Sequence, residues 1–339
     1  MYIFALQLFI KVVVYNILNT LNYGVSNMIK IFIDGKEGTT GLKIYERFIN
    51  RKDVEVLVLE EDKRKDPAYR KEFINKSDIT FLCLPDDAAT EAAEFAENPN
   101  VKIIDASTAH RTAEGWCYGF PELSEAHRTR IEKCTRIAVP GCHASGFVAI
   151  IYPLVKTGLL SPDYSVSCFS LTGYSGGGKK MIAEYESSQR SVYLDSPRLY
   201  GISQMHKHLK EMKFVTGISK EPVFSPVVAD FYSGMEVSVP LFKESTGLTA
   251  KEIHQFYCDY YSHAKMVSVA SYNGESEFSN KFIPANYMSG RNDMKIFVTG
   301  NDERITVSAL FDNLGKGASG AAVQCMNIAC GAEETLGLI

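Results

Sequence analysis

Short apolar runs alternate with amphipathic stretches through the first part of the chain. Five runs have the length and β-branched content of buried strands: residues 29–34, 54–59, 79–84, 101–105 and 137–139. Three helical segments separate several of them: residues 41–50, 67–75 and 87–97. Strands joined by helices of this length pair in parallel through right-handed crossovers. Residues 28–141 are therefore predicted to form a doubly wound α/β domain with a Rossmann-type parallel sheet.

The pattern changes in the second half of the chain. Five segments alternate in side-chain character or carry β-branched residues: 165–171, 235–239, 266–272, 294–298 and 305–311. Such segments are typical of a sheet with one face covered by helices, so residues 142–314 are predicted to form a second, α+β domain. Residues 317–334 are rich in Ala and Gly, which favours a helix packed closely against another element.

Residues 1–27 stand apart because they are apolar, nearly uncharged and followed directly by Met28, which begins the first predicted strand. Gln7, Lys11 and Asn16 interrupt the run of about 20 apolar residues that a membrane anchor needs. A secretory signal also fits poorly, because it requires a basic start and a small-residue cleavage site. We expect a dispensable N-terminal extension, with an anchor or an additional packed helix as the alternatives.

Composition narrows the class of protein. The chain has 339 residues, of which 45% are hydrophobic and 22% charged, so disorder and low complexity are excluded. The net charge of -4 leaves no basic field for nucleic acid or for a membrane surface, which favours a small-molecule partner. The eight cysteines form no Cys-x-x-Cys pair, which indicates buried free thiols in a reducing, cytoplasmic compartment.

A glycine-rich turn follows the first predicted strand and opens a helix. Its backbone and hydroxyl groups suit a pyrophosphate at Gly35, Gly38, Thr39, Thr40 and Gly41. Lys36 departs from the usual Gly-x-Gly-x-x-Gly spacing, so a plain glycine-rich turn is the alternative. The second strand ends in residues 60–64, Glu-Glu-Asp-Lys-Arg, where an acid favours NAD and a base favours NADP. These residues alone leave the choice of cofactor open.

Cys142 lies between the last strand of the first domain and an amphipathic helix. At a helix N-terminus the dipole lowers the pKa of a thiol and favours the nucleophilic thiolate. A buried structural cysteine is the alternative. His206 and His208 are candidate bases for the reaction at Cys142. If this segment is a helix, Glu211 shares a face with His208 and is expected to orient its ring. No third ligand accompanies the two histidines, so we expect no metal.

Two further segments have the composition of anion-binding loops. Ser107 and Arg111 follow the carboxyl end of a strand, where open α/β sheets bind ligands. Ser175, Gly176 and Lys179 combine exposed backbone donors with positive charge. Each segment alone is an ordinary turn, but together they indicate an anionic, phosphorylated substrate.

In this order, seven motifs resemble those of the N-acetyl-gamma-glutamyl-phosphate reductase family, in its shorter second type: residues 35–41, 105–111, 118–123, 140–146, 175–180, 206–211 and 312–320. The resemblance runs from Met28 to near the C-terminus. It implies NADPH-dependent reduction of N-acetylglutamyl phosphate to N-acetylglutamate semialdehyde and phosphate, in arginine biosynthesis. It also implies a homodimer or homotetramer formed through the sheet of the second domain.

The resemblance assigns roles to the candidate residues. Cys142 attacks the acyl phosphate and forms a thioester, and His206 or His208 exchanges the proton, with His206 favoured. Arg111 and Ser107 hold the phosphate, with Lys179 and Glu211 near the substrate. The resemblance also implies that residues 315–339 return to the first domain and that four residues of the second half lie near the cofactor: Ser175, Gly176, Asn313 and Gly317.

Two alternatives remain. Aspartate-semialdehyde dehydrogenase shares the architecture and the thioester chemistry, but there an Asn commonly follows the nucleophile, whereas this chain has His143. A catalytically silent nucleotide-binding relative is the other, and the presence of Cys142 and His206 argues against it.

Overall fold

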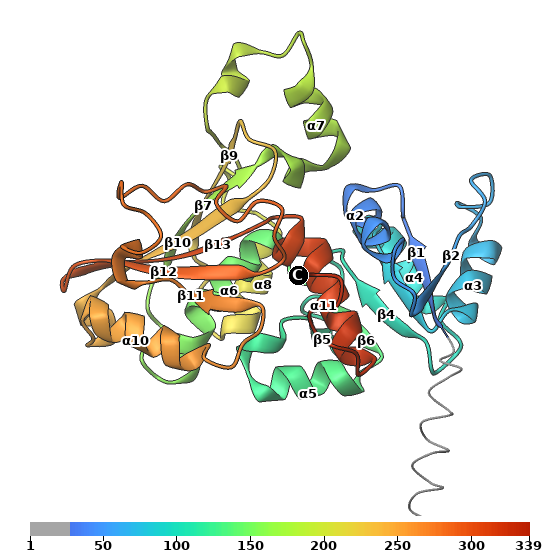
Figure 1. The fold of residues 1–339 in the computed structure, drawn as a ribbon, viewed down its shortest axis with the longest axis horizontal. Coiled ribbons are helices and arrows are strands. Elements are labelled where there is room, and N and C mark those ends of the chain that lie inside the picture. Colours follow the sequence, from blue (N-terminus) through green and yellow to red (C-terminus); the bar gives the residue numbers. More distant parts are fainter. Residues whose placement is uncertain (1–27) are drawn as a thin grey trace, which may run out of the picture.

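The computed structural model describes residues 28–339, so the expectation for residues 1–27 lies outside the described part. The described residues form two parts, each built on its own sheet, and the chain passes from the first part to the second at the helix that begins with Cys142 (Figure 1). Over residues 28–339, no helix combines the length and the apolar character needed to cross a bilayer.

The first sheet has six parallel strands in the order β2-β1-β3-β4-β6-β5, which confirms the doubly wound fold. Its strands are β1 (Ile29–Asp34), β2 (Val54–Leu57), β3 (Ile79–Leu82), β4 (Lys102–Asp105), β5 (Cys117–Tyr118) and β6 (Arg136–Ala138). The chain leaves β1 for β2 on one side and returns to β3 on the other. This reversal opens a crevice at the carboxyl edge of the sheet, where such folds bind ligands.

Helices pack around this sheet: α2 (Thr39–Phe48), α3 (Pro67–Lys76), α4 (Asp86–Glu94) and α5 (Glu125–Lys133). The last helix, α11 (Gly320–Ala329), also belongs here, since Ala322 and Met326 share a buried cluster with Ile31 of β1. Lys316, in the turn that leads into α11, is buried and pairs with Glu122 at 2.7 Å. This ion pair ties the C-terminal segment to the first sheet's connecting loops.

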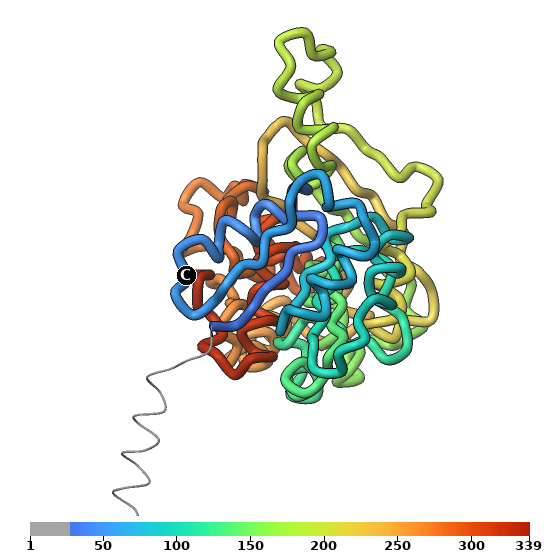
Figure 2. The backbone as a smooth tube through the Cα atoms, turned by 90° about the vertical axis from the view of Figure 1, so that its right-hand side faces the viewer, coloured from blue at the N-terminus to red at the C-terminus, as the bar shows by residue number. Residues whose placement is uncertain are grey.

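The second sheet has seven strands in the order β11-β12-β13-β10-β7-β9-β8. They are β7 (Ser167–Gly173), β8 (Arg198–Leu199), β9 (Val223–Ala229), β10 (Met235–Phe242), β11 (Val267–Val269), β12 (Met294–Gly300) and β13 (Arg304–Phe311). One face is covered by α6 (Cys142–Lys156), α8 (His208–Thr216) and α10 (Ala250–Tyr260), as predicted (Figure 1). The segment with α7 (Gly178–Glu186) projects from the body of the molecule (Figures 1 and 2).

Strands β8 and β9 were not predicted from the sequence. β8 has two residues, and Pro226 interrupts the pattern of β9 because proline lacks the N–H of a central strand. The Pro226 carbonyl still accepts a hydrogen bond from the Tyr200 N–H at 3.0 Å. This bond fixes the chain just beyond β8 against the sheet.

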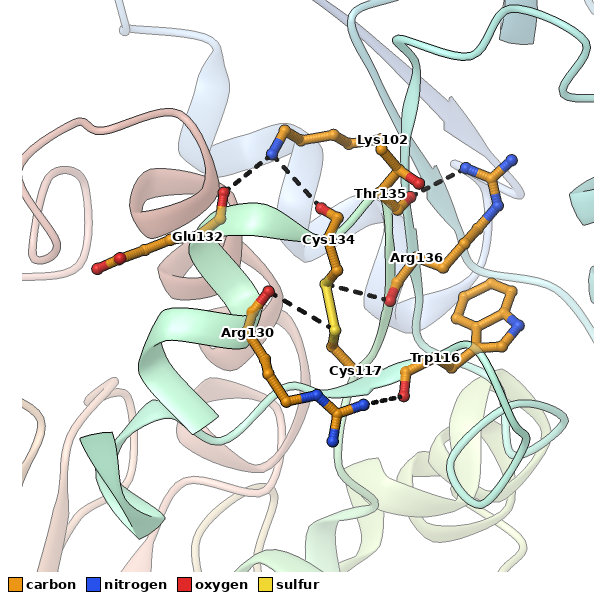
Figure 3. Close-up of a disulfide and its surroundings, with 8 residues drawn as sticks. All are labelled: Lys102, Trp116, Cys117, Arg130, Glu132, Cys134, Thr135 and Arg136. Atoms are coloured by element: carbon orange, nitrogen blue, oxygen red, sulfur yellow. Dashed lines mark hydrogen bonds between the residues drawn. A yellow bond between two sulfur atoms is a disulfide. The ribbon is translucent and has the colours of Figure 1, made fainter. Parts of the chain in front are cut away.

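The expectation that all eight cysteines are free thiols is wrong for Cys117 and Cys134, which the structure joins as a disulfide (Figure 3). Their Cα atoms are 6.7 Å apart. The reason is topological: β5 pairs with β6, and Cys134 lies just before β6, so Cys117 is brought alongside it. Six cysteines are free in residues 28–339: Cys83, Cys142, Cys168, Cys258, Cys325 and Cys330.

The close approach of α6 to the second sheet gives a prediction about stability. A Cβ on Gly146 would lie 2.6 Å from the Val237 side chain and 2.9 Å from Phe311. Gly146→Ala should therefore overpack the core and lower the free energy of unfolding by about 1–3 kcal/mol. Urea denaturation measures the change. Lys156→Ala, at the exposed end of the same helix, is the control and should stay within about 0.5 kcal/mol of the parent protein.

Candidate functional site

A cavity of about 340 Å³ lies between the carboxyl edge of the first sheet and the second sheet. Eight of the residues that the sequence singled out line it: Thr40, Arg111, Cys142, Gly176, His206, His208, Asn313 and Gly317. These residues come from six separate segments of the chain. The fold therefore brings the candidate nucleophile, both histidines and part of the glycine-rich turn at residues 35–41, called here the nucleotide-type turn, to one cavity.

Cys142 is the first residue of α6, as the sequence predicted, and Gly141 is the N-cap. Arg111 Nη1 and His208 Nε2 both approach the position that a Gly141 side chain would occupy. The start of α6 therefore lies against a guanidinium and an imidazole. Only glycine fits at this point, because any side chain would displace one of these groups.

The expected lowering of the Cys142 pKa is opposed by burial. Burial raises the pKa of the Cys142 thiol above its ordinary value, because the thiolate loses water. The Arg111 guanidinium, the His143 backbone N–H and the Lys207 ammonium act in the opposite direction and favour the thiolate. The reactivity of Cys142 thus depends on the positive groups held next to it.

Glu211 does not orient His208, so that interpretation is wrong. The buried Glu211 carboxylate pairs with Arg111 at 3.0 Å and accepts hydrogen bonds from the Tyr118 hydroxyl at 2.9 Å and the Gly141 N–H at 2.8 Å. The physical reason is that α8 directs Glu211 towards the first sheet rather than along its own surface. Glu211 therefore positions Arg111 and the start of α6.

His206 and His208 lie together, with ring centroids 4.7 Å apart. His206 precedes α8 rather than belonging to it, and its Nδ1 accepts a hydrogen bond from the His208 backbone N–H at 3.2 Å. Burial lowers the pKa of both rings, strongly for His208. Among residues 28–339, His208 Nδ1 has no hydrogen-bond partner. The same part of the chain contains no cluster of three or more metal-binding side chains.

Like Glu211, two other predicted substrate-binding residues lie outside the cavity lining. The Ser107 hydroxyl donates to Asp105 at 2.7 Å and accepts from the Ala109 N–H, and Ser107 does not line the cavity. Lys179 is exposed on the projecting segment and also lies outside the cavity lining. The sequence shows that Ser107 and Lys179 are polar. It does not show the tertiary contacts that decide whether their side chains point into the cavity. The cavity is lined instead by residues that sequence reasoning missed: Thr172, Tyr200 and Lys207.

The nucleotide-type turn adjoins two more cavities. The smaller, of about 200 Å³, is lined among others by Gly38, Thr39, Thr40, Ser175 and Gly176. The larger, of about 640 Å³, runs along the ends of β1 and β2 and is lined among others by Gly35, Lys36, Glu60, Glu61, Arg64 and Lys65. Gly35 has φ +86° and backs onto the Cys83 carbonyl, so only glycine leaves this cradle open.

These cavities fit a dinucleotide. Thr39 and Thr40 begin α2, whose N-terminal N–H groups and dipole favour a pyrophosphate. Gly41 lines none of the three cavities and instead packs against the Gly35 carbonyl, which brings α2 close to β1. Asn313 donates to Ser175 Oγ at 2.9 Å and accepts from the Gly234 N–H, so it fixes the loop at the junction of the cavities.

Two family models match the chain: "Semialdehyde dehydrogenase, NAD binding domain" over residues 35–131 and "Semialdehyde dehydrogenase, dimerisation domain" over residues 142–313. N-acetyl-gamma-glutamyl-phosphate reductase of Trichormus variabilis is 44% identical over 322 residues, covering 92% of this chain and 100% of the relative. The protein of the same name from Rhizobium meliloti is 44% identical over 305 residues, covering 88% and 98%.

Solved structures share the fold at low sequence identity. Aspartate semialdehyde dehydrogenase II of Vibrio cholerae superposes with a TM-score of 0.66 at 14% identity, covering 90% of this chain and 98% of that chain. Aspartate semialdehyde dehydrogenase with NADP from Candida albicans gives a TM-score of 0.64 at 14% identity, covering 89% and 98%. At this level of identity the likeness shows the fold alone.

The electrostatics of Cys142 can be tested directly. Arg111→Met removes a group that favours the thiolate, so the pKa of Cys142 should rise further above the ordinary value of about 8.5. The pH dependence of iodoacetamide alkylation at Cys142, located by mass spectrometry, reports this pKa. Arg111→Lys retains the charge and should shift the profile less. A profile that does not move in Arg111→Met would contradict the prediction.

Proposed function

The chain belongs to the N-acetyl-gamma-glutamyl-phosphate reductase family, and on that premise we propose that it reduces N-acetylglutamyl phosphate to N-acetylglutamate semialdehyde and phosphate in arginine biosynthesis. The observation that carries the proposal is the position of Cys142. It begins α6 inside a cavity that Arg111 and both histidines also line, and this cavity shares Thr40 and Gly176 with the smaller cavity at the start of α2.

The chemistry proceeds at the Cys142 sulfur. The thiolate attacks the acyl carbon, a carbon–sulfur bond forms, and the bond to the phosphate oxygen breaks to release phosphate. When bound, NADPH supplies the hydride that reduces the resulting thioester. The carbon–sulfur bond then breaks, which releases the aldehyde and restores the thiolate.

The residues around Cys142 stabilise the anionic oxygens of this sequence. Arg111 donates to Glu211, to the Val139 carbonyl and to the Ala106 carbonyl, so its remaining N–H groups are held in a fixed orientation at the cavity. Such preorganised donors stabilise developing negative charge without reorganising. His206, with Nδ1 already accepting a hydrogen bond, carries its proton on Nε2 and is the candidate acid.

NADP(H) is the proposed cofactor. Arg64 and Lys65 line the larger cavity and supply positive charge for a 2′-phosphate, beside the acidic Glu60 and Glu61. Lys63, which the sequence placed with Arg64, is not part of that lining and pairs with Glu60 at 2.5 Å. Of the bases at the end of the second strand, we therefore propose Arg64 and Lys65, rather than Lys63, for this role.

We also propose that the protein acts as a homodimer or homotetramer, and that it does so in the cytoplasm, because six of its eight cysteines are free thiols despite the Cys117–Cys134 pair. The match of residues 142–313 to a dimerisation domain supports assembly through the second domain. Its sheet leaves apolar side chains such as Phe169 and Val223 exposed on the face opposite the helices, which a second copy can cover.

Assays of NADPH oxidation test the function. N-acetylglutamyl phosphate should be reduced and aspartyl phosphate should not, because the relatives that cover the chain carry the former name. Cys142→Ser should abolish the reduction, since a hydroxyl is far less ionised than a thiol and forms an ester that resists hydride. NADPH binding and the circular dichroism spectrum should remain unchanged.

The matched control is Cys258→Ser, on the distant helix α10, which should keep full activity. In the parent protein, mass spectrometry should locate the acyl group on Cys142. Turnover of Cys142→Ser within about tenfold of the parent protein, or acyl label on another cysteine, would refute the mechanism.

Cofactor preference gives a separate prediction. Arg64→Glu should raise KM for NADPH by about tenfold or more and change KM for NADH much less, because only NADPH carries the 2′-phosphate. Steady-state kinetics with both cofactors measure the ratio. Lys63→Glu introduces the same charge reversal one residue away and should leave the ratio nearly unchanged. Equal weakening of both cofactors by Arg64→Glu would remove Arg64 from this role.

A further inference from the structure

A line of three hydrogen-bonding side chains runs from the core of the second domain into the catalytic cavity. Ser170 Oγ lies 2.7 Å from His143 Nδ1, and His143 Nε2 lies 2.5 Å from the Tyr200 hydroxyl. Ser170 is buried on β7 and does not line the cavity that holds Cys142, whereas the buried His143 of α6 and the half-buried Tyr200 both line it. The line therefore ends at the reacting centre.

The direction of each bond follows from the donors and acceptors present. Within residues 28–339, Ser170 Oγ has no hydrogen-bond partner other than His143, so its buried proton is satisfied only by donation to Nδ1. A neutral imidazole that accepts at Nδ1 carries its proton on Nε2 and donates it to the Tyr200 oxygen. The opposite arrangement would leave the Ser170 proton buried without an acceptor. The Tyr200 proton is thus directed away from His143, into the cavity.

Burial keeps both rings in the protonation states that this arrangement needs. It lowers the pKa of His143 to about 3, with His206 adding to the effect, so His143 is neutral at physiological pH. It also raises the pKa of Tyr200 well above the ordinary value, and the neighbouring Cys142 adds to that shift. Tyr200 therefore keeps its proton even when Cys142 is a thiolate.

We propose that Ser170 and His143 are positioning residues that turn the Tyr200 O–H towards Cys142, where it donates a hydrogen bond to an anionic oxygen of the substrate. The proposal rests on the proposed function, which supplies two kinds of anionic oxygen. One kind is the oxygens of the phosphoryl group, and the other is the oxygen that becomes negative as the thioester is reduced. Tyr200 is also well anchored for this role, because its backbone N–H bonds the Pro226 carbonyl.

The first test reads the tautomer of His143 and does not depend on turnover. Nitrogen-15 spectra of histidine-labelled full-length protein, with the His143 signals assigned by their loss in His143→Gln, should show a proton on Nε2 and none on Nδ1. This pattern should persist from about pH 5 to pH 8. A proton on Nδ1, or titration of His143 in that range, would overturn the proposal even if the enzyme is active.

The second test measures the donor itself. Tyr200→Phe should lower kcat/KM for N-acetylglutamyl phosphate by about tenfold to a hundredfold, as expected for loss of one preorganised donor. In the reverse reaction, a raised KM for phosphate identifies a phosphoryl oxygen, and a lowered kcat identifies the oxygen of the reacting carbon. Tyr193→Phe, exposed on the same segment, should match the parent protein. Changes below about twofold in all these parameters would overturn the proposal.

A third test separates positioning from simple structural support. A glutamine at position 143 carries an amide N–H that replaces Nε2–H, so His143→Gln should retain much of the activity that His143→Leu loses. In a Tyr200→Phe background the two substitutions should have nearly equal effects, because the group that they position is absent. Equal losses from His143→Gln and His143→Leu in the parent background would overturn the positioning role.

Discussion

The active-site architecture depends on one buried carboxylate. Glu211 comes from α8 in the second domain, yet its partners are Arg111 and Tyr118 from the first domain and the Gly141 N–H at the start of α6. A buried charge is tolerable only when it is paired and hydrogen-bonded, so the two domains must close on this group in one register. That register places Cys142 and Arg111 together, and the rest of the cavity forms around them.

Desolvation then sets the protonation states of the site. The same burial that raises the pKa of Cys142 lowers those of His143, His206 and His208. Because the rings are neutral, their N–H groups act as hydrogen-bond donors rather than as cations. The positive charge that favours the thiolate comes mainly from Arg111. Before the substrate binds, the histidines are neutral and Arg111 is paired with Glu211, so little charge is left uncompensated. The same groups can donate hydrogen bonds to an anionic substrate.

Most regular elements could be predicted from the sequence, and the exceptions have physical causes. β3 and β4 are apolar runs buried along most of their length, and β1 and the edge strand β2 carry β-branched residues beside the exposed Lys30 and Glu55. β5 and β8 contain two residues each, too few to show the alternation of a strand. In β9, Pro226 interrupts the strand pattern, so this strand was not recognised. The pairing of Cys117 with Cys134 follows from the order of β5 and β6 in the sheet, which no local pattern records.

What the sequence determined by itself was local: the turn at Gly35, the position of Cys142 at a helix start, and the presence of two neighbouring histidines. Glycine conformations, helix caps and apolar periodicity act over a few residues, so they can be recognised in order along a chain. Only the tertiary structure decided which polar groups meet. Glu211 and Arg111 are separated by 100 residues and meet because the domains close, and that contact, not the expected one with His208, is the one that Glu211 makes.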